Sequence, residues 1–180
     1  YRGGGALNAT LKTAAAAIIV LGGGYIGTLL ASYYSVRAAQ IEQFIAALVQ
    51  IEFNIGFLKI PASKALNLAA NSRRGAVGRI LKEVSEDMDR FKKPPPDAWR
   101  DAMRRNKPSL CITGEDAEIL IQFADNLGCG DVESERGNIR AACAKLELAE
   151  RSAKAERDRM SRLLKGVGML GGMLIAVLLL

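Results

Sequence analysis

The sequence predicts an all-α protein, an antiparallel helical bundle of about six helices carried between an N-terminal and a C-terminal membrane helix. The first observation is the distribution of charge. No charged residue lies between Lys12 and Arg37, and none follows Lys165. All 19 acidic residues, and all but two of the 25 basic residues, therefore lie from Arg37 to Lys165. The second is that apolar residues in this charged middle recur at helical spacing, with no β-rich segment among them. The predicted parts are a tail over 1–12, a membrane helix over 13–36, a bundle over 37–165 and a hydrophobic, transmembrane helix over 166–180.

Residues 13–36 form the first predicted membrane helix. As a helix, these 24 uncharged residues span about 36 Å, against a hydrocarbon core of about 30 Å. Gly23 and Gly27 have the four-residue spacing that lets two membrane helices pack closely. We therefore predict a membrane anchor with a helix-packing face at these two glycines.

The same stretch contains a second, competing pattern. Gly22 to Gly27 reads G-x-G-x-x-G after an apolar run, and Glu42 follows twenty positions later, as in a Rossmann-type NAD or FAD enzyme. However, Glu42 lies in a segment of helical periodicity, and no second strand is available to build a parallel sheet. The anchor is the favoured interpretation, and no cofactor is expected.

Residues 166–180 form the second predicted membrane helix. Their 15 residues span about 22 Å, which is short for a crossing, and a start at Leu163 lengthens the run to about 27 Å. Gly168 and Gly172 repeat the small-residue spacing of the first span. A buried core helix or an interfacial segment is the alternative.

Two spans place both termini on one side of the membrane and the bundle on the other. The bundle side carries Arg37 and a basic run from Arg151 to Lys165, whereas the termini offer only Arg2 and Lys12. The positive-inside rule therefore predicts that the bundle is cytoplasmic.

The bundle helices follow from their breaks and apolar stripes. The first is predicted from Arg37 to about Phe57, with a stripe that includes Val49, and Pro61 opens the second, which ends at Asn71. The third covers Ala76 to Phe91, whose stripe consists of Val77, Ile80, Leu81, Val84, Met88 and Phe91.

The later helices are predicted from their caps. After the three prolines at 94–96, Asp97 is expected to cap a short helix that bears Trp99. Thr113 and Asp116 resemble a capping box that opens a helix to Leu127, with Gly128 as its C′ glycine. Asp131 is expected to cap a long last helix whose apolar stripe is Ile139, Ala142, Cys143 and Leu146. Its polar continuation reads as a solvated stalk that leads into the second span.

The sequence predicts no catalytic site. It contains no histidine, the commonest general base and metal ligand. Cys111, Cys129 and Cys143 lack the pairing of a zinc site or a disulfide framework and suit a reducing compartment. No nucleic-acid recognition pattern accompanies the basic charge. We therefore expect neither metal, nucleic acid nor small-molecule substrate.

The chain resembles the stage III sporulation protein AB family of endospore-forming bacteria over nearly its whole length. The resemblance rests on the N-terminal membrane helix and on QIEQFIAALVQIEFNI, DAWRDAM, ILIQFADNLGCGDVESERGNIRAACAKLE and RLLKGVGMLGGMLIAVLLL. Its most specific element is Leu127-Gly128-x-x-Asp131 followed by Ile139 and the long helix.

The resemblance implies a soluble domain similar to the F domain of type II secretion platforms. It also implies a non-enzymatic platform component of the channel complex that links mother cell and forespore. Such a component would lie in the mother-cell membrane around the forespore and dock a secretion-type cytoplasmic ATPase and other channel components. A platform subunit of a different secretion or pilus system is the alternative.

Overall fold

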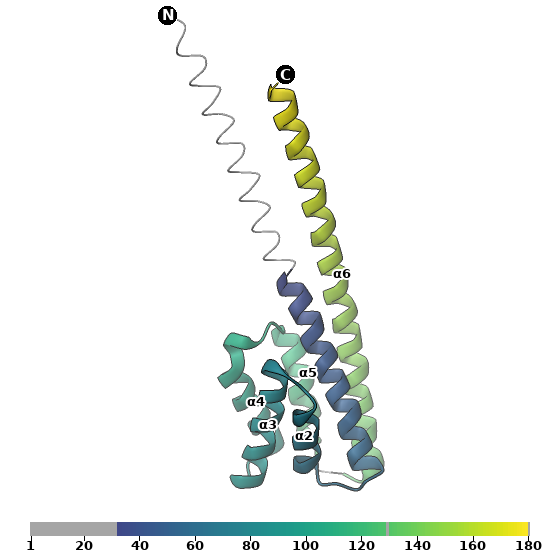
Figure 1. Ribbon diagram of the computed structural model, residues 1–180. Helices are drawn as coiled ribbons and strands as arrows, with labels where there is room; N and C mark the ends of the chain where they lie inside the picture. Colours follow the sequence, from purple (N-terminus) through teal and green to yellow (C-terminus); the bar gives the residue numbers. More distant parts are fainter. Residues whose placement is uncertain (1–31, 129, 180) are drawn as a thin grey trace, which may run out of the picture. The chain divides into compact units, whose positions relative to one another are not determined.

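The computed structural model describes residues 32–128 and 130–179, and within the last helix the surroundings of residues 164, 165 and 167–179 lie outside this description (Figure 1). An unlabelled helix over residues 32–56 comes first. It is followed by α2 (Ala62–Asn71), α3 (Gly75–Arg90), α4 (Pro95–Asn106), the short 3₁₀ helix η1 (Lys107–Ser109), α5 (Gly114–Asp125) and α6 (Val132–Leu179). The described residues contain no strand, so the all-α prediction is confirmed for them.

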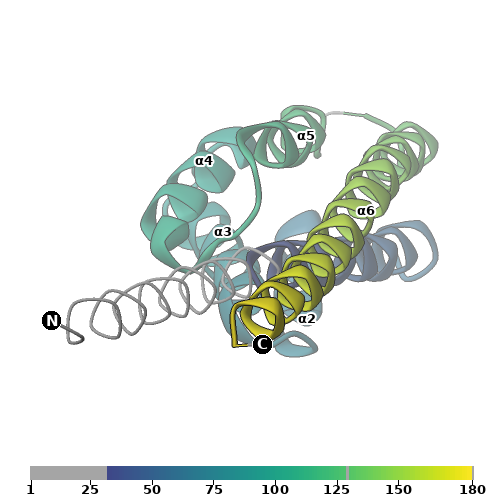
Figure 2. The same cartoon turned by 90° about the horizontal axis from the view of Figure 1, so that it is seen from above.

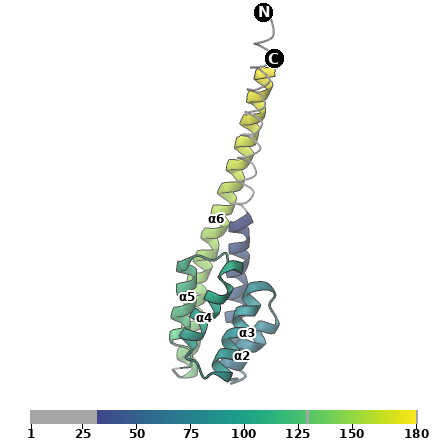
Figure 3. The same ribbon diagram turned by 90° about the vertical axis from the view of Figure 1, so that its left-hand side faces the viewer.

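The chain divides into two compact units. One comprises Val36–Ala153, and the other comprises Tyr1–Ser35 with Lys154–Leu180. Within the first unit, helix 32–56 runs beside the first part of α6 and in the opposite direction (Figures 1 and 3). Seen from above, α3, α4 and α5 follow one another around the remaining side of the unit (Figure 2).

Three aromatic side chains form the centre of the core. Trp99 of α4 lies between Phe44 of helix 32–56 and Phe123 of α5, with ring centroids 6.3 and 6.0 Å away, and all three are almost fully buried. The Trp99–Phe123 pair is edge-to-face, an arrangement worth about 0.5–1.5 kcal/mol beyond its buried area. The two ring contacts of Trp99 together join three helices that are distant in sequence.

Most predicted helix starts agree with the structure, but the role of Asp97 was wrong. The residue before α4 is Pro94, and Asp97 lies in the first turn, where it pairs with Arg100 at 3.1 Å. Proline fits the first helical positions because their N–H groups have no partner within the helix. By contrast, the capping box of Thr113 and Asp116 is confirmed, with N···O distances of 3.2 and 2.9 Å.

Two predicted core positions and one helix end were also wrong. Val49 is 53% exposed, because it lies on the face of its helix that no other helix covers, and Phe91 is 72% exposed because α3 has already ended at Arg90. The helix predicted to reach Leu127 ends at Asp125, since the N–H groups of Asn126 and Leu127 bond three residues back instead of four. Gly128 therefore lies beyond the C′ position.

The predicted membrane helices lie largely outside what the structure describes. Residues 13–31 of the first lie outside the described residues, as do the side-chain surroundings of most of the second. Over the described residues, no helix combines the length and apolar character needed to cross a membrane.

Candidate interaction site

The residues singled out by the sequence meet at the corner between α5 and α6. Gly128 has a φ of +80°, a conformation that strains any residue with a Cβ atom, and its N–H donates to Glu135 Oε1 at 2.7 Å. Asp131 Oδ1 accepts the N–H of Ser134 at 3.1 Å, which caps α6, and hydrogen bonds from Ser134 lower the pKa of Asp131. The side chains of Leu127 and Ile139 are buried in the core. The four residues thus comprise two core anchors, a turn and a cap, which together set the direction in which α6 leaves the corner.

Asn138 is a further residue of this corner that the sequence did not identify as functional. Its Nδ2 donates to the carbonyl oxygen of Phe123 at 2.8 Å, across fifteen positions of sequence. That carbonyl belongs to the last turn of α5 and also accepts the N–H of Asn126 at 3.3 Å, so Asn138 adds a second, shorter bond to it. The only sequence signal was an asparagine inside a helix, which is a poor helix former.

A tight loop after helix 32–56 faces the corner. The N–H of Ile60 donates to the carbonyl oxygen of Asn54 at 3.1 Å, and Lys59 adopts a positive φ of 54°. Between this loop and the corner lies a groove of about 310 Å³, lined by Ile55, Lys59, Ile60, Pro61, Ala62, Gly128, Val132 and Glu135. The corner and the loop therefore form one surface feature.

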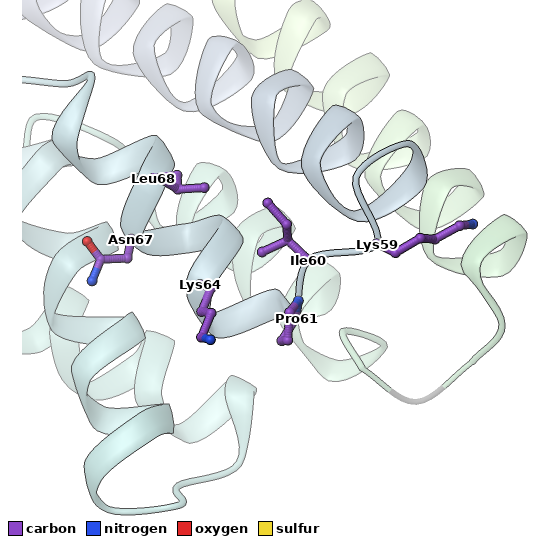
Figure 4. A pocket seen from close by; sticks show the side chains of 6 residues that line it. All are labelled: Lys59, Ile60, Pro61, Lys64, Asn67 and Leu68. Carbon is purple, nitrogen blue, oxygen red and sulfur yellow. The ribbon is translucent and has the colours of Figure 1, made fainter.

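A second groove of about 420 Å³ continues along α2 (Figure 4). Its lining consists of Lys59, Ile60, Pro61, Lys64, Asn67 and Leu68. The side chain of Ile60 lies between the loop and α2, and Leu68 is partly exposed farther along the helix (Figure 4). The lining thus combines apolar side chains with two exposed lysines and contains no acidic residue. We call the two grooves together, with their shared residues Lys59 to Pro61, the basic groove.

Contacts with α6 hold the loop in place. Glu52 accepts from Arg136 Nε at 3.4 Å and from Arg140 Nε at 2.8 Å, and the guanidinium of Arg136 lies 5.6 Å from the centre of the Phe57 ring. A Cβ on Gly56 would meet the side chain of Arg136 at 3.0 Å, so a glycine lets the two elements approach closely. The basic groove is therefore built on a braced loop.

A buried ion pair holds the opposite end of helix 32–56. Arg37 and Asp116 are 7% and 1% exposed, and the guanidinium donates from Nε and Nη2 to the two carboxylate oxygens at 2.8 and 3.1 Å. Burial raises the pKa of Asp116, but the hydrogen bonds from Arg37 and Thr113 outweigh it, so the pKa lies below its usual value. Gln40, one turn on, donates to the carbonyl oxygen of Ser109 and accepts the N–H of Cys111, at 2.9 and 2.8 Å. These contacts lock the start of α5 to the first helix.

The described residues offer little for chemistry. They contain no group of three or more Cys, Asp or Glu side chains arranged to hold a metal ion. Cys111 and Cys143 are free and half-buried, and burial, with Glu52 and Glu147 nearby, raises the pKa of Cys143 to about 11. Cys129 lies outside the described residues.

Comparison with known proteins identifies the family. A family described as Stage III sporulation protein AB matches residues 12–180. The chain belongs to this family. The stage III sporulation protein AB of Bacillus subtilis (strain 168) is 28% identical over 169 residues, which cover 94% of this chain and 99% of that protein.

A solved structure supports the same family assignment. A structure of a stage III sporulation protein AB matches with a TM-score of 0.62 and 26% identity, covering 68% of this chain and 96% of that one. The predicted family and the all-α bundle are thus confirmed.

The helix-packing residues of this stage III sporulation protein AB chain remain predictions. Gly23 and Gly27 lie outside the described residues. Gly168 and Gly172 fall within α6, but what surrounds them lies outside the description.

Proposed function

We propose that this chain is a non-enzymatic membrane platform component of the sporulation channel complex that links mother cell and forespore. Membership of the stage III sporulation protein AB family carries the proposal. The two uncharged terminal segments support a place in the mother-cell membrane around the forespore, and the charge asymmetry supports a cytoplasmic bundle.

The proposed partner in the cytoplasm is a secretion-type ATPase, and the proposed docking surface is the basic groove. In the part of the basic groove along α2, exposed Lys59 and Lys64 border an apolar lining that includes Ile60 and Leu68. Glu135, the acidic residue of the other part, accepts the N–H of Gly128. The part along α2 is therefore complementary to an acidic segment with apolar anchors. The braced loop makes the surface rigid, which lowers the entropic cost of binding. Because α6 continues without a break from the corner to Leu179, docking at this surface could be transmitted along one helix.

Co-purification of the full chain from sporulating cells in detergent tests the partner. We expect the secretion-type ATPase to be retained by the wild type and lost with the double variant Lys59→Glu/Lys64→Glu. The matched control is Lys82→Glu, an exposed lysine of α3 outside the groove, which should retain it. Equal retention by both variants would remove the groove from the proposal, and no retention by the wild type would remove the ATPase. Extraction of the chain by high salt without detergent would contradict its place in the membrane.

A further inference from the structure

Helix 32–56 and α6 share an outer face that no other helix of the unit covers. On helix 32–56, Glu52 is turned toward α6, whereas Gln50 donates to Ser72 at the end of α2 at 3.4 Å. On α6, Arg140 is turned toward Glu52, whereas Lys145 donates to Gln122 of α5 at 3.2 Å. The residues between these two sides of each helix are exposed and point away from the core.

The exposed residues of this outer face form two regular seams. On helix 32–56 they are Ala39, Glu42, Ala46, Val49 and Phe53. On α6 they are Gly137, Ala141, Ala144, Leu148 and Arg151. Both sets alternate steps of three and four residues, a mean period of about 3.5, which is the spacing that keeps a seam against another helix. A face with two such seams fits a partner that presents two helices.

The ion pairs of Glu52 show which residues of the two seams lie side by side. We call two residues level when they lie at the same height along the axes of helix 32–56 and α6. Since Glu52 bonds Arg136 and Arg140, residue 52 lies level with about residue 138 of the antiparallel α6. At a rise of about 1.5 Å per residue, Phe53 then lies at the height of Gly137 along the helix axes, and Val49 at the height of Ala141. The large side chains of one seam, both about half exposed, therefore lie level with the smallest residues of the other.

The charges follow the same arrangement. Glu42 and Arg151 are both exposed, lie near the same level, and have no ion partner among the described residues. Leu148, 66% exposed, lies between Arg151 and the small residues of its seam, at a level where the other seam offers Ala46 and Glu42. One seam is thus complementary to the other in both size and charge.

We infer that the outer face binds a second copy of this chain in an isologous dimer, with the two-fold axis parallel to the two helices. Rotation about that axis leaves the height of each residue along the helices unchanged. It places the seam of helix 32–56 of each copy against the α6 seam of the other copy, so the same contact forms twice. Phe53 and Val49 then pack on Gly137, Ala141 and Ala144, and Glu42 meets Arg151. A two-fold axis perpendicular to the helices would instead put large residues opposite large ones and leave both charges unpaired.

The size of the face indicates a weak dimer. A face about 22 Å long and two helices wide buries on the order of 1,000 Å² in total, which is the lower limit for a specific interface. We therefore expect self-association in the micromolar range or weaker for the detergent-solubilised chain, increased by confinement in one membrane.

Cross-linking between differently tagged copies tests the arrangement. In a full chain with Cys111, Cys129 and Cys143 replaced by serine, one copy carries Val49→Cys and the other Ala144→Cys. We expect a short thiol cross-linker to give a dimer that bears both tags. The control pair, Lys82→Cys on α3 with Glu118→Cys on α5, is exposed outside the outer face and should give none. Failure to form the doubly tagged dimer, an equal yield from the control pair, or adducts only with a protein of another mass would overturn the inference.

A charge swap provides an independent test that does not depend on packing. Glu42→Lys and Arg151→Glu should each weaken self-association in detergent by roughly tenfold, since each replaces two attractive contacts by repulsive ones. The double variant should return to within about threefold of the wild type, measured by sedimentation. A double variant as weak as the single ones would refute the pairing of these residues.

Discussion

The buried pair of Arg37 and Asp116 should be the costliest ion pair of the unit to break. Asp116→Asn keeps an oxygen that can accept the N–H of Thr113, now 2.9 Å from Oδ2, but removes the negative charge that Arg37 faces at 2.8 Å. Removal of one member of a buried pair typically costs 3–5 kcal/mol because the other charge remains desolvated. We expect about 3 kcal/mol, at the lower end, because the cap at Thr113 survives.

Trp99 makes the effect measurable in the intact chain. It is the single tryptophan and is fully buried in the core, so its emission reports unfolding of the bundle alone. With an m value of about 1.5 kcal/mol per M for a unit of this size, a loss of 3 kcal/mol lowers the urea midpoint by about 2 M.

Asp97→Asn is the matched control. Asp97 is the third residue of α4, as Asp116 is of α5, but its ion pair with Arg100 is about half exposed. Exposed pairs contribute little, so the midpoint should move by a small fraction of the Asp116→Asn shift. Equal shifts for the two variants would refute the argument that burial decides the cost.

The lowered pKa of Asp116 predicts how the difference in stability between the wild type and Asp116→Asn changes with pH. Because the pKa of Asp116 is lowered in the folded state, its contribution is present above the unfolded value of about 3.9 and is lost as the pH falls through the folded value. The wild type should therefore lose part of its advantage over Asp116→Asn below about pH 4. A difference between the two proteins that is constant down to pH 2 would contradict the lowered pKa.

Three further predictions concern the corner and the thiols. Gly128→Ala should cost about 1–2 kcal/mol because of its positive φ, whereas Gly114→Ala, with no atom within 4 Å of the added Cβ and no such φ, should cost little in the same urea titration. Asn138→Ala should destabilise the unit by about 1 kcal/mol, because it removes the shorter of the two hydrogen bonds to the Phe123 carbonyl and leaves the 3.3 Å bond from the Asn126 N–H. Asn126→Ala, which removes only an exposed 3.3 Å side-chain bond, should be nearly neutral. Cys143, with a pKa of about 11, should be alkylated slowly at pH 8 and much faster in urea, as followed by peptide mass spectrometry. Rapid alkylation of Cys143 in the folded chain would show that its thiol is not shielded.

The sequence by itself determined the helices, two of their N-terminal caps and the family. The capping box of Thr113 and Asp116 and the cap at Asp131 were predictable because the bonded groups are three residues apart, within reach of any chain that turns into a helix there. The glycine at 128 was likewise readable as a break. Errors arose where a helix end depends on one turn of hydrogen bonds, as at Asp125, since the end of a periodic apolar pattern does not mark that turn.

The tertiary structure decided which residues meet across the bundle. In the sequence Arg37 marked a helix start and contributed to a charge asymmetry, yet it bonds a carboxylate 79 positions away because helix 32–56 packs against the start of α5. Val49 belongs to the apolar pattern of its helix, but the placement of α2 and α6 leaves it on the outer face. The basic groove depends in the same way on where a loop, α2 and the α5–α6 corner come together. Periodicity shows that a helix has an apolar side, whereas only packing shows which part of that side faces the core.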